Sequence, residues 1–264
     1  MTPLSSADMV RNGRLAPLDA FIRRDPSVVE GLHPEAVKLF EHGGAQYGLP
    51  VYIAPLCAHL NLDVFAAAGV APPGPDWTMA DLLALGRELR RAGVARPLAW
   101  TRDITFLFPL LRGQGAQPYD AQNGRMRLDT PEMLRAMERM REVALACGEP
   151  TAPSQGRCDA LLCRGEAAIA FWGAVTGASC VSFRHSVAPL PRGERPSCLL
   201  LAEGVGICAS CQRPEAAWKA LKRFISAEAS ETLVKAEVMF PPRHDGLVSF
   251  LSKHDPSYAW VFRG

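Results

Sequence analysis

The chain has 264 residues, of which 48% are hydrophobic and 21% are charged. This balance is typical of a globular protein with a substantial core, and it excludes a disordered, collagen-like or coiled-coil chain. The 29 Lys and Arg residues nearly cancel the 27 Asp and Glu residues, so the formal net charge is +2. The sequence shows no basic stripe with interleaved aromatic residues, which argues against nucleic acid as a partner. No apolar run approaches the ~20 residues of a membrane helix, and the first residues of the given chain carry no export signal.

The first part of the chain predicts short helices followed by a strand. Apolar residues at helical spacing predict a helix over residues 15–22. A second helix is expected to begin at Pro34 and to end at the glycine pair 43–44, because Pro favours the first helical position and Gly the end. Residues 45–60 are β-prone, but Pro50 cannot donate a ladder hydrogen bond. This segment is therefore predicted to be an edge or crossover strand.

Helices and strands alternate in the rest of the chain. Asn61 is a helix-cap residue, and Thr78 with Asp81 forms a capping-box pattern. Met133, Met137 and Met140 recur at helical spacing and are interpreted as core residues. The other expected helices cover residues 104–111, 131–144, 158–164, 214–225 and 227–238, with Thr130 as the cap of the second. The expected strands cover residues 97–100, 167–172, 186–190 and 198–208, and a loop or hairpin is expected around residues 123–124. Such alternation predicts an α/β fold with a mainly parallel sheet.

Signatures of catalysis are missing from the sequence. It contains no G-x-S-x-G, no H-E-x-x-H and no glycine-rich phosphate loop. Each of the six His residues stands alone in the sequence and is interpreted as a surface or core residue. Glu166 and Glu203 could pair in a cleft, but two acids of unknown separation are weak evidence for a glycosidase. We expect no catalytic residue, no metal and no cofactor.

The eight cysteines leave two interpretations open. Cys208 and Cys211 form a C-x-x-C that leads into a predicted helix, which is the setting of a thiol-dependent oxidoreductase. A zinc site would need a second pair, or His residues at matching spacing, and none follows. The alternative interpretation is that the cysteines have only a structural role. Scattered, unpaired cysteines fit a reducing compartment better than an exported disulfide scaffold.

Aromatic residues gather beside the expected chain crossings. They are Tyr47, Tyr52, Trp100, Phe106, Trp172 and Trp260. Flat rings stack on the C–H faces of sugars, while acids, Asn and Arg bind the hydroxyl groups. Core packing is the alternative for any single ring.

Short motifs follow one another in a consistent order along most of the chain. They are residues 47–52, 61–65, 68–70, Pro72-Pro73 with Trp77, 164–169, 189–193, 203–207, 214–218 and 241–243. Together they resemble the bacterial extracellular solute-binding proteins of ABC importers, in the sugar-binding group that includes maltose-binding protein. The chain departs from the family pattern at Leu60, where a Tyr is usual. The family's initial strand–helix–strand block and part of its C-terminal helical block are missing, so the resemblance implies truncation at both ends.

The resemblance implies an α/β, two-lobe, type II periplasmic-binding-protein-like fold. Lobe one would comprise residues 1–53 and 206–264, and lobe two residues 54–205. The hinge crossings would lie near residues 48–54 and 202–206. Lobe one would be incomplete, because it keeps only about two strands and a sheet usually needs three or more.

The resemblance also implies a function without catalysis. The chain would be the substrate-binding component of an ABC importer, holding a carbohydrate or similar polar solute in a cleft between the lobes and delivering it to the permease subunits. It would act as a monomer, in the periplasm or outside the cell, where a lipoprotein form is also consistent with the family. The expected ligand contacts are Tyr52, Trp100, Phe106, Trp172, Glu203 and Arg243. Alternatives are the Cys208/Cys211 oxidoreductase and a non-transporting sensor or remnant with this fold.

Overall fold

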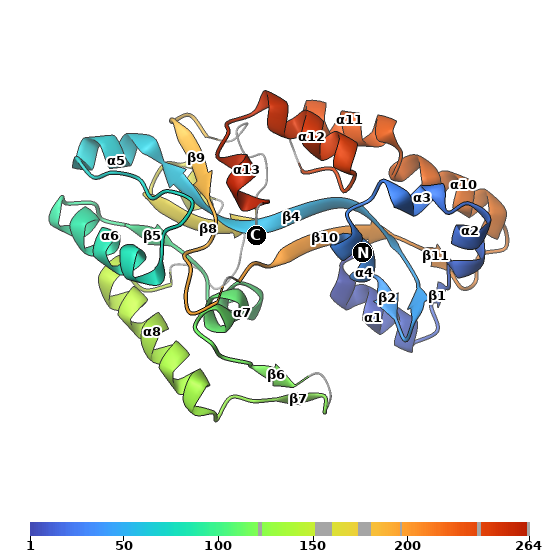
Figure 1. Ribbon diagram of the computed structural model, residues 1–264, viewed down its shortest axis with the longest axis horizontal. Helices are drawn as coiled ribbons and strands as arrows, with labels where there is room; N and C mark the ends of the chain where they lie inside the picture. The colour runs from blue at the N-terminus through green and yellow to red at the C-terminus, as the bar shows by residue number, and fades with distance from the viewer. Residues whose placement is uncertain (121–122, 151–159, 174–180, 196, 237–238, 263–264) are drawn as a thin grey trace. The chain divides into compact units, whose positions relative to one another are not determined.

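The computed structural model describes residues 1–120, 123–150, 160–173, 181–195, 197–236 and 239–262. The chain forms two compact units (Figure 1). Unit 1 comprises Met1–Ala54 and Leu200–His254, and unit 2 comprises Pro55–Leu199 and Asp255–Gly264. The predicted lobe bounds instead placed residues 200–205 in lobe two and residues 255–264 in lobe one. That the units act as lobes about a hinge remains a prediction.

Unit 1 is built from short helices and short strand pairs. Its helices are α1 (Pro3–Arg11), α2 (Asp19–Arg24), α3 (Ser27–Glu30), α4 (Pro34–Lys38), α10 (Pro214–Phe224), α11 (Ala227–Ala236) and α12 (His244–Lys253). Its strands are β1 (Leu15–Ala16), β2 (Glu41–His42), β3 (Ala45–Gln46), the first residues of β4 (Leu49–Asn61), β10 (Leu200–Val205) and β11 (Ile207–Cys208). The strands described here pair as β1 with β11, β2 with β3, and β4 with β10. The sequence predicts about two strands for lobe one, whereas the described residues of unit 1 contain these six strand segments, and the incompleteness of a lobe stays a prediction.

The core of unit 1 joins residues from both ends of the chain. Leu18 and Leu49 are fully buried, and Ile207 is 3% exposed. The rings of Phe21 and Trp218 stack with centroids 5.2 Å apart. Burial of these apolar side chains docks α2 against α10 and holds the two sequence segments of the unit together.

Two local predictions for unit 1 are wrong. Residues 15–22 do not form one helix, because Leu15 and Ala16 pair as a strand with β11 and α2 begins at Asp19. The glycine pair 43–44 does not end a helix, since α4 ends at Lys38. The two glycines form the turn of the β2–β3 hairpin, with φ values of 60° and 77°. Positive φ at both positions is the conformation that a two-residue hairpin turn requires.

The sheet of unit 2 is organised around β4. From Leu56 onward, β4 pairs antiparallel with β8 (Ile169–Gly173) and with β9 (His185–Ala188). Among the named strands of the described residues, β5 (Leu98–Ala99) alone pairs in parallel, with β8. The prediction of a mainly parallel sheet is therefore wrong. Of the two alternatives for residues 45–60, the edge strand is wrong, and the crossover strand agrees with the passage of β4 from unit 1 to unit 2 after Ala54. The missing N–H of Pro50 is tolerated because it precedes the part of β4 that pairs with β8 and β9.

Helices and a hairpin complete unit 2 (Figure 1). They are α5 (Leu62–Ala68), α6 (Met79–Arg91), α7 (Ile104–Gly113), α8 (Pro131–Cys147), α13 (Tyr258–Val261), and strands β6 (Tyr119–Asp120) and β7 (Arg125–Met126). The predicted caps are confirmed at Asn61 and at Thr78 with Asp81, and Thr130 caps α8. The predicted helix over 158–164 begins outside the described residues. In the part of the chain that the structure describes, no helix is long and apolar enough to cross a membrane.

The methionine stripe of α8 is only partly a core feature. Met133 and Met140 are buried, with 6% and 4% of their surface exposed. Met137 is 45% exposed, so its assignment to the core is wrong. Its position lies between the two buried turns, on the solvent side of a helix that packs against α6 and α7.

Candidate functional site

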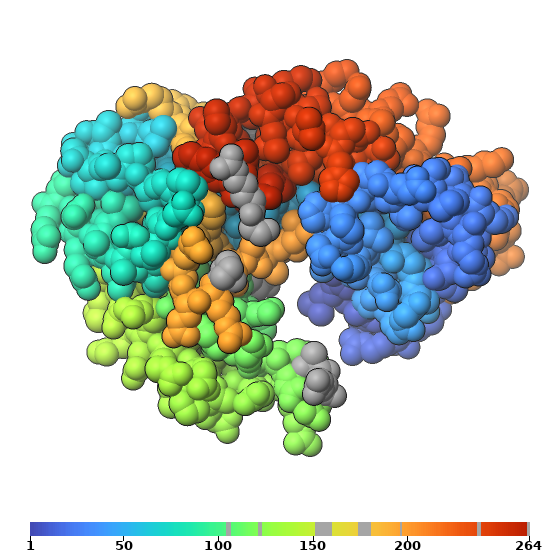
Figure 2. All heavy atoms as spheres, in the orientation of Figure 1, coloured from blue at the N-terminus to red at the C-terminus, as the bar shows by residue number. Residues whose placement is uncertain are grey.

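A cavity of about 620 Å³ lies within unit 2. Its walls come from β4, the segment before α6, the segment between β9 and β10, and α13. Figure 2 shows the face on which the orange segment before β10 runs beside the teal segment before α6. The lining residues are Leu56, Pro75, Asp76, Pro189, Leu190, Arg192, Ser197, Cys198, Trp260 and Val261. A mostly apolar wall with a few polar groups, at this volume, is typical of a small-molecule site.

Backbone hydrogen bonds fix the polar wall of the cavity. The N–H of Arg192 donates to the carbonyl of Trp77 at 2.9 Å, and the N–H of Met79 donates to the carbonyl of Arg192 at 2.8 Å. The indole N–H of Trp77 donates to the carbonyl of Pro189 at 2.7 Å. Because Met79 is also the first residue of α6, the capped helix start holds this wall in place.

The charged groups of this wall remain accessible. The Arg192 guanidinium lies 3.3 Å from the Asp76 carboxylate, and the two side chains are 55% and 85% exposed. An ion pair this exposed contributes only about 0–1 kcal/mol to stability. Arg192 and Asp76 are therefore available to a ligand's hydroxyl groups.

Trp260 supplies the aromatic ring of the cavity. It lies on α13, which packs against β9, where the Ser257 hydroxyl accepts from the Val187 N–H at 3.1 Å. The neighbouring Tyr258 is 4% exposed and anchors the helix, whereas Trp260 is only partly buried. A partly exposed indole beside fixed polar groups can stack on a sugar and leave its hydroxyls to them.

Two predicted site residues meet in unit 1. Strand β4 carries Tyr52 and its neighbour β10 carries Glu203. The Tyr52 hydroxyl donates a hydrogen bond to the Glu203 carboxylate, and both side chains are partly buried. Burial, together with the Glu203 charge, raises the pKa of Tyr52 to about 12. The pair therefore offers a neutral phenol and an oriented carboxylate, both of which can bind hydroxyl groups.

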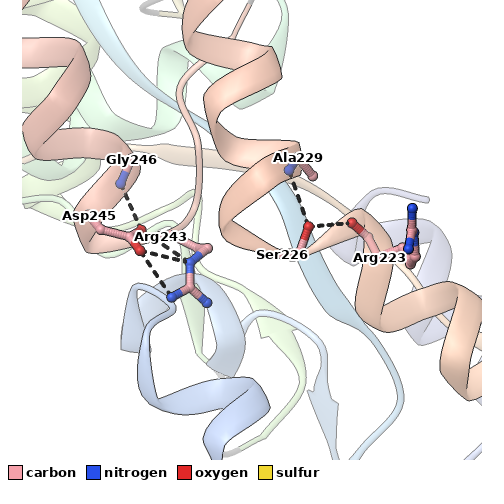
Figure 3. A network of polar contacts seen from close by, with 6 residues as sticks. All are labelled: Arg223, Ser226, Ala229, Arg243, Asp245 and Gly246. Atoms are coloured by element: carbon pink, nitrogen blue, oxygen red, sulfur yellow. Dashed lines mark hydrogen bonds and ion pairs between the residues drawn. The ribbon is translucent and has the colours of Figure 1, made fainter.

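Arg243 is held by groups of its own unit. Its guanidinium binds the Asp245 carboxylate at 3.1 Å and is only 20% exposed. Figure 3 shows that carboxylate also accepting from the Gly246 N–H, at 2.8 Å. The guanidinium fits against Gly31, where a Cβ would overlap it. Arg243 thus fixes the start of α12, and its role as a ligand contact remains a prediction.

A second group of contacts in Figure 3 caps a helix. The Ser226 hydroxyl donates to the Arg223 carbonyl at 2.9 Å and accepts from the Ala229 N–H at 3.2 Å. This satisfies a free N–H in the first turn of α11. The contact fixes the connection between α10 and α11 and offers no group to a ligand.

Of the three predicted aromatic contacts of unit 2, Trp100 and Trp172 are not among the described residues that line the cavity. Trp100 is 4% exposed, and its indole N–H donates to the Gly148 carbonyl at 3.0 Å, so its ring presents almost no surface. Trp172 is partly buried on β8, opposite Cys57. Phe106 belongs to α7, but its side chain lies outside the described residues. As ligand contacts, all three remain predictions.

The catalytic alternatives gain no support from the structure. Glu166 is paired with Arg96 at 3.2 Å and with Arg164 at 2.8 Å in unit 2, whereas Glu203 lies in unit 1. Cys208 and Cys211 are free thiols before α10. Among the residues that the structure describes, no group of three His, Cys, Asp or Glu side chains could hold a metal ion.

One cysteine differs from the expectation of unpaired thiols. Cys163 is disulfide-bonded, while Cys57, Cys147, Cys198, Cys208 and Cys211 are free. The scattered positions in the sequence could not reveal this pairing. The expectation of a reducing compartment, which rested on unpaired cysteines, loses its basis.

Sequence reasoning missed most of the cavity. Trp260 stood out as an aromatic residue, but Asp76, Arg192 and Ser197 did not. The Pro189–Gly193 motif was the one signal that pointed to this wall. It could not show which distant segments face it.

Comparison with known proteins completes the description of the site. Residues 4–231 match the family model described as bacterial extracellular solute-binding protein. The ABC substrate-binding protein Lmo0181 from Listeria monocytogenes, in complex with cycloalternan, has a TM-score of 0.85 at 20% identity, over 99% of this chain and 70% of its own. A solute-binding protein from Thermotoga lettingae, bound to α-D-tagatose, has a TM-score of 0.84 at 18% identity, over 97% and 69%. One from Agrobacterium radiobacter, with ribitol, has a TM-score of 0.82 at 17% identity, over 100% and 72%. Comparison with curated proteins gives no match. These likenesses confirm the predicted type II fold.

Proposed function

Because the chain belongs to the bacterial extracellular solute-binding protein family, we propose that it binds a carbohydrate or similar polyhydroxylated solute and delivers it to an ABC importer. The observation that carries the choice of solute is the cavity of unit 2. There a partly exposed Trp260 ring lies with the accessible Arg192–Asp76 pair around about 620 Å³. This combination suits a molecule with apolar C–H faces and many hydroxyl groups.

The ligands of the three similar structures named above belong to the same chemical class. Cycloalternan, α-D-tagatose and ribitol are each polyhydroxylated and uncharged. At 17–20% identity these structures show the fold, and their ligands serve as candidates to be tested with this chain.

The predicted hinge belongs to this proposal. Strand β4 crosses from unit 1 to unit 2 after Ala54, and the chain returns to unit 1 at Leu200, the first residue of β10. Solute binding would close the two units as lobes about these passages. Tyr52 and Glu203, near the crossings, would then contact the solute. Trp172 and Arg243 are retained as further contacts to be tested.

Delivery and location follow from the same proposal. Members of this family work outside the cytoplasm, and the chain would present the loaded solute to permease subunits as a monomer. No bond of the solute would be made or broken. The absence of chemistry is tested by recovering the solute unchanged after release from the protein.

The proposal is tested by thermal shift against a panel of oligosaccharides, ketoses and polyols, followed by calorimetry of each hit. A ligand that prefers the folded state raises the melting temperature as its concentration exceeds the Kd. Substituting Trp260→Ala should weaken binding by on the order of 1–2 kcal/mol, about a tenfold rise in Kd, while Trp260→Phe should keep most of the affinity. The melting temperature of each variant without ligand controls for folding. If no member of the panel binds, the proposed solute class is wrong.

A further inference from the structure

Two cysteines of unit 2 lie on neighbouring passages of the chain. The Leu56 N–H donates to the Leu199 carbonyl at 2.8 Å. Farther along, Gly204 approaches the Leu49 carbonyl, so the two passages run antiparallel. In an antiparallel pair, the residues next to a hydrogen-bonded pair face each other with Cα atoms about 4.5 Å apart. One step forward from Leu56 and one step back from Leu199 places Cys57 opposite Cys198.

The sulfur contacts agree with this register. Cys198 Sγ lies 3.8 Å from the Leu56 carbonyl oxygen, on the chain that carries Cys57. Cys57 Sγ lies 3.5 Å from His59 Nε2, on the same face of β4. Both thiols are free. A disulfide requires Cα atoms roughly 4.4–6.8 Å apart, which a facing pair of this kind provides.

The two thiols differ in what can reach them. Residue Cys198 is exposed and lines the cavity of about 620 Å³, although burial of its sulfur raises the pKa of its thiol too. Cys57 is 0% exposed, and burial together with the nearby Cys198 raises its pKa well above that of a free thiol. A dissolved reagent therefore meets Cys198 first, and Cys57 can react only with a group already attached there.

We propose that Cys198 and Cys57 form a thiol–disulfide exchange site for small-molecule disulfides. The Cys198 thiolate attacks one sulfur of the small disulfide, forms a mixed disulfide and releases one thiol, which takes up the Cys198 proton. Cys57 then attacks Cys198 Sγ, and the second thiol leaves with the Cys57 proton. Two protein thiols are oxidised to one disulfide, and the small disulfide is reduced to two thiols.

The exchange changes unit 2 in two ways. The new bond ties β4 to the segment before β10, next to the points where the chain passes to and from unit 1. It also moves Cys198 Sγ from the cavity lining toward β4. A cross-link between residues so distant in sequence restricts the unfolded chain, so oxidation should raise the melting temperature.

The other free cysteines provide controls. Cys147 is buried, with its Sγ 3.7 Å from the Leu82 carbonyl oxygen, and no cysteine faces it among the residues described around it. Cys208 and Cys211 lie in unit 1, joined by a backbone turn of 3.0 Å, and could form a disulfide of their own. The experiment is therefore run in the full chain and again with Cys208→Ser and Cys211→Ser.

The test uses oxidised glutathione as the probe and peptide mapping by mass spectrometry without reduction. We expect a cross-linked peptide pair that contains Cys57 and Cys198, and its loss after dithiothreitol. In Cys57→Ser, Cys198 should instead retain one glutathionyl group. In Cys198→Ser, Cys57 should stay a thiol. The disulfide of Cys163 serves as the internal reference for the map.

The peptide map of the wild-type chain decides between the outcomes by itself. A variant that fails to fold therefore does not weaken the test. A glutathionyl group that persists on Cys198 with Cys57 intact overturns the proposal. So does a map in which both residues remain thiols, or one in which Cys198 joins Cys208 or Cys211. The experiment contains no solute, so its failure leaves the proposed transport function untouched.

Discussion

The buried histidine pair of unit 2 makes the stability of the protein depend on pH. His59 is 1% exposed, and its Nδ1 lies 2.9 Å from Nε2 of His185. The groups that face the pair are Cys57 on β4, the Gly173 carbonyl on β8, and Asp255, whose charge favours protonation of His185. Burial nevertheless dominates, and it lowers the pKa of His59 to about 3 and that of His185 to about 4.

The sign and size of the effect follow from proton binding. Below about pH 6.5 the unfolded chain protonates both imidazoles, while the folded chain keeps them neutral down to about pH 4. Stability is therefore lost as the pH falls. One pH unit corresponds to about 1.4 kcal/mol for each proton bound. The unfolding free energy should therefore fall by roughly 1.9 kcal/mol per histidine between pH 7 and pH 5. For both histidines together the fall in unfolding free energy is about 3.5–4 kcal/mol. This is a large share of the roughly 5–15 kcal/mol by which a typical domain is stable.

Urea unfolding at pH 7, 6 and 5, followed by tryptophan fluorescence, measures this loss. His59→Gln and His185→Gln each remove one titrating ring, so each should reduce the pH dependence of the unfolding free energy by about half. An equal slope in the wild-type chain and both pair variants would show that the buried rings do not titrate as the geometry requires.

Two further predictions concern a helix cap and the packing of two neighbouring strands. Thr78→Ala removes one half of the capping box with Asp81, and it should lower the unfolding free energy by about 0.5–2 kcal/mol in the same urea assay. Gly204→Ala places a methyl group 2.6 Å from the Phe40 ring and 2.8 Å from a backbone oxygen of Leu49. It should cost about 1–3 kcal/mol, whereas Gly74→Ala meets nothing within 4 Å and should change stability by less than about 0.5 kcal/mol. Equal effects of the two glycine substitutions would contradict the close packing of β10 on β4.

The elements that could be predicted from sequence are those whose partners lie a few residues away. The Thr78 side chain is bonded to the N–H of Asp81, and the Asn61 side chain to those of Asp63 and Val64. A cap of this kind is complete within one helical turn, so three or four residues contain all its information. The hairpin at residues 123–124 was predictable for the same reason.

The elements that could not be predicted depend on distant partners. Leu15 and Ala16 have apolar spacing that suits a helix, but Cys208 and Ile207 offer them a strand partner. The direction in which strands pair could not be predicted for the same reason. The direction of β4 relative to β8 depends on where the intervening chain returns, and no residue within either strand records this.

The candidate site shows the same division. The order of the motifs places Tyr52 and Glu203 at the two predicted crossings, but the hydrogen bond between them was not predicted. Asp76 and Arg192 could not be paired, because more than a hundred residues separate them and neither motif shows which distant segment it faces. Their proximity is created by the bonds of Trp77 with Pro189 and Arg192, whose backbone atoms leave no trace in residue type.

The two arginines near the candidate contacts differ in what a solute would have to displace. The Arg243 guanidinium is 20% exposed, bonded to Asp245 and fitted against Gly31. Redirecting it would leave a carboxylate unpaired at the start of α12, so its hydrogen bonds are already used by the fold. The Arg192 guanidinium is 55% exposed, and its pair with Asp76 contributes only about 0–1 kcal/mol. A hydroxyl group can replace that pair at little cost, while the backbone of Arg192 stays fixed. For this reason Arg192 is the stronger candidate for a solute contact, and the contact of Arg243 with a solute stays a prediction.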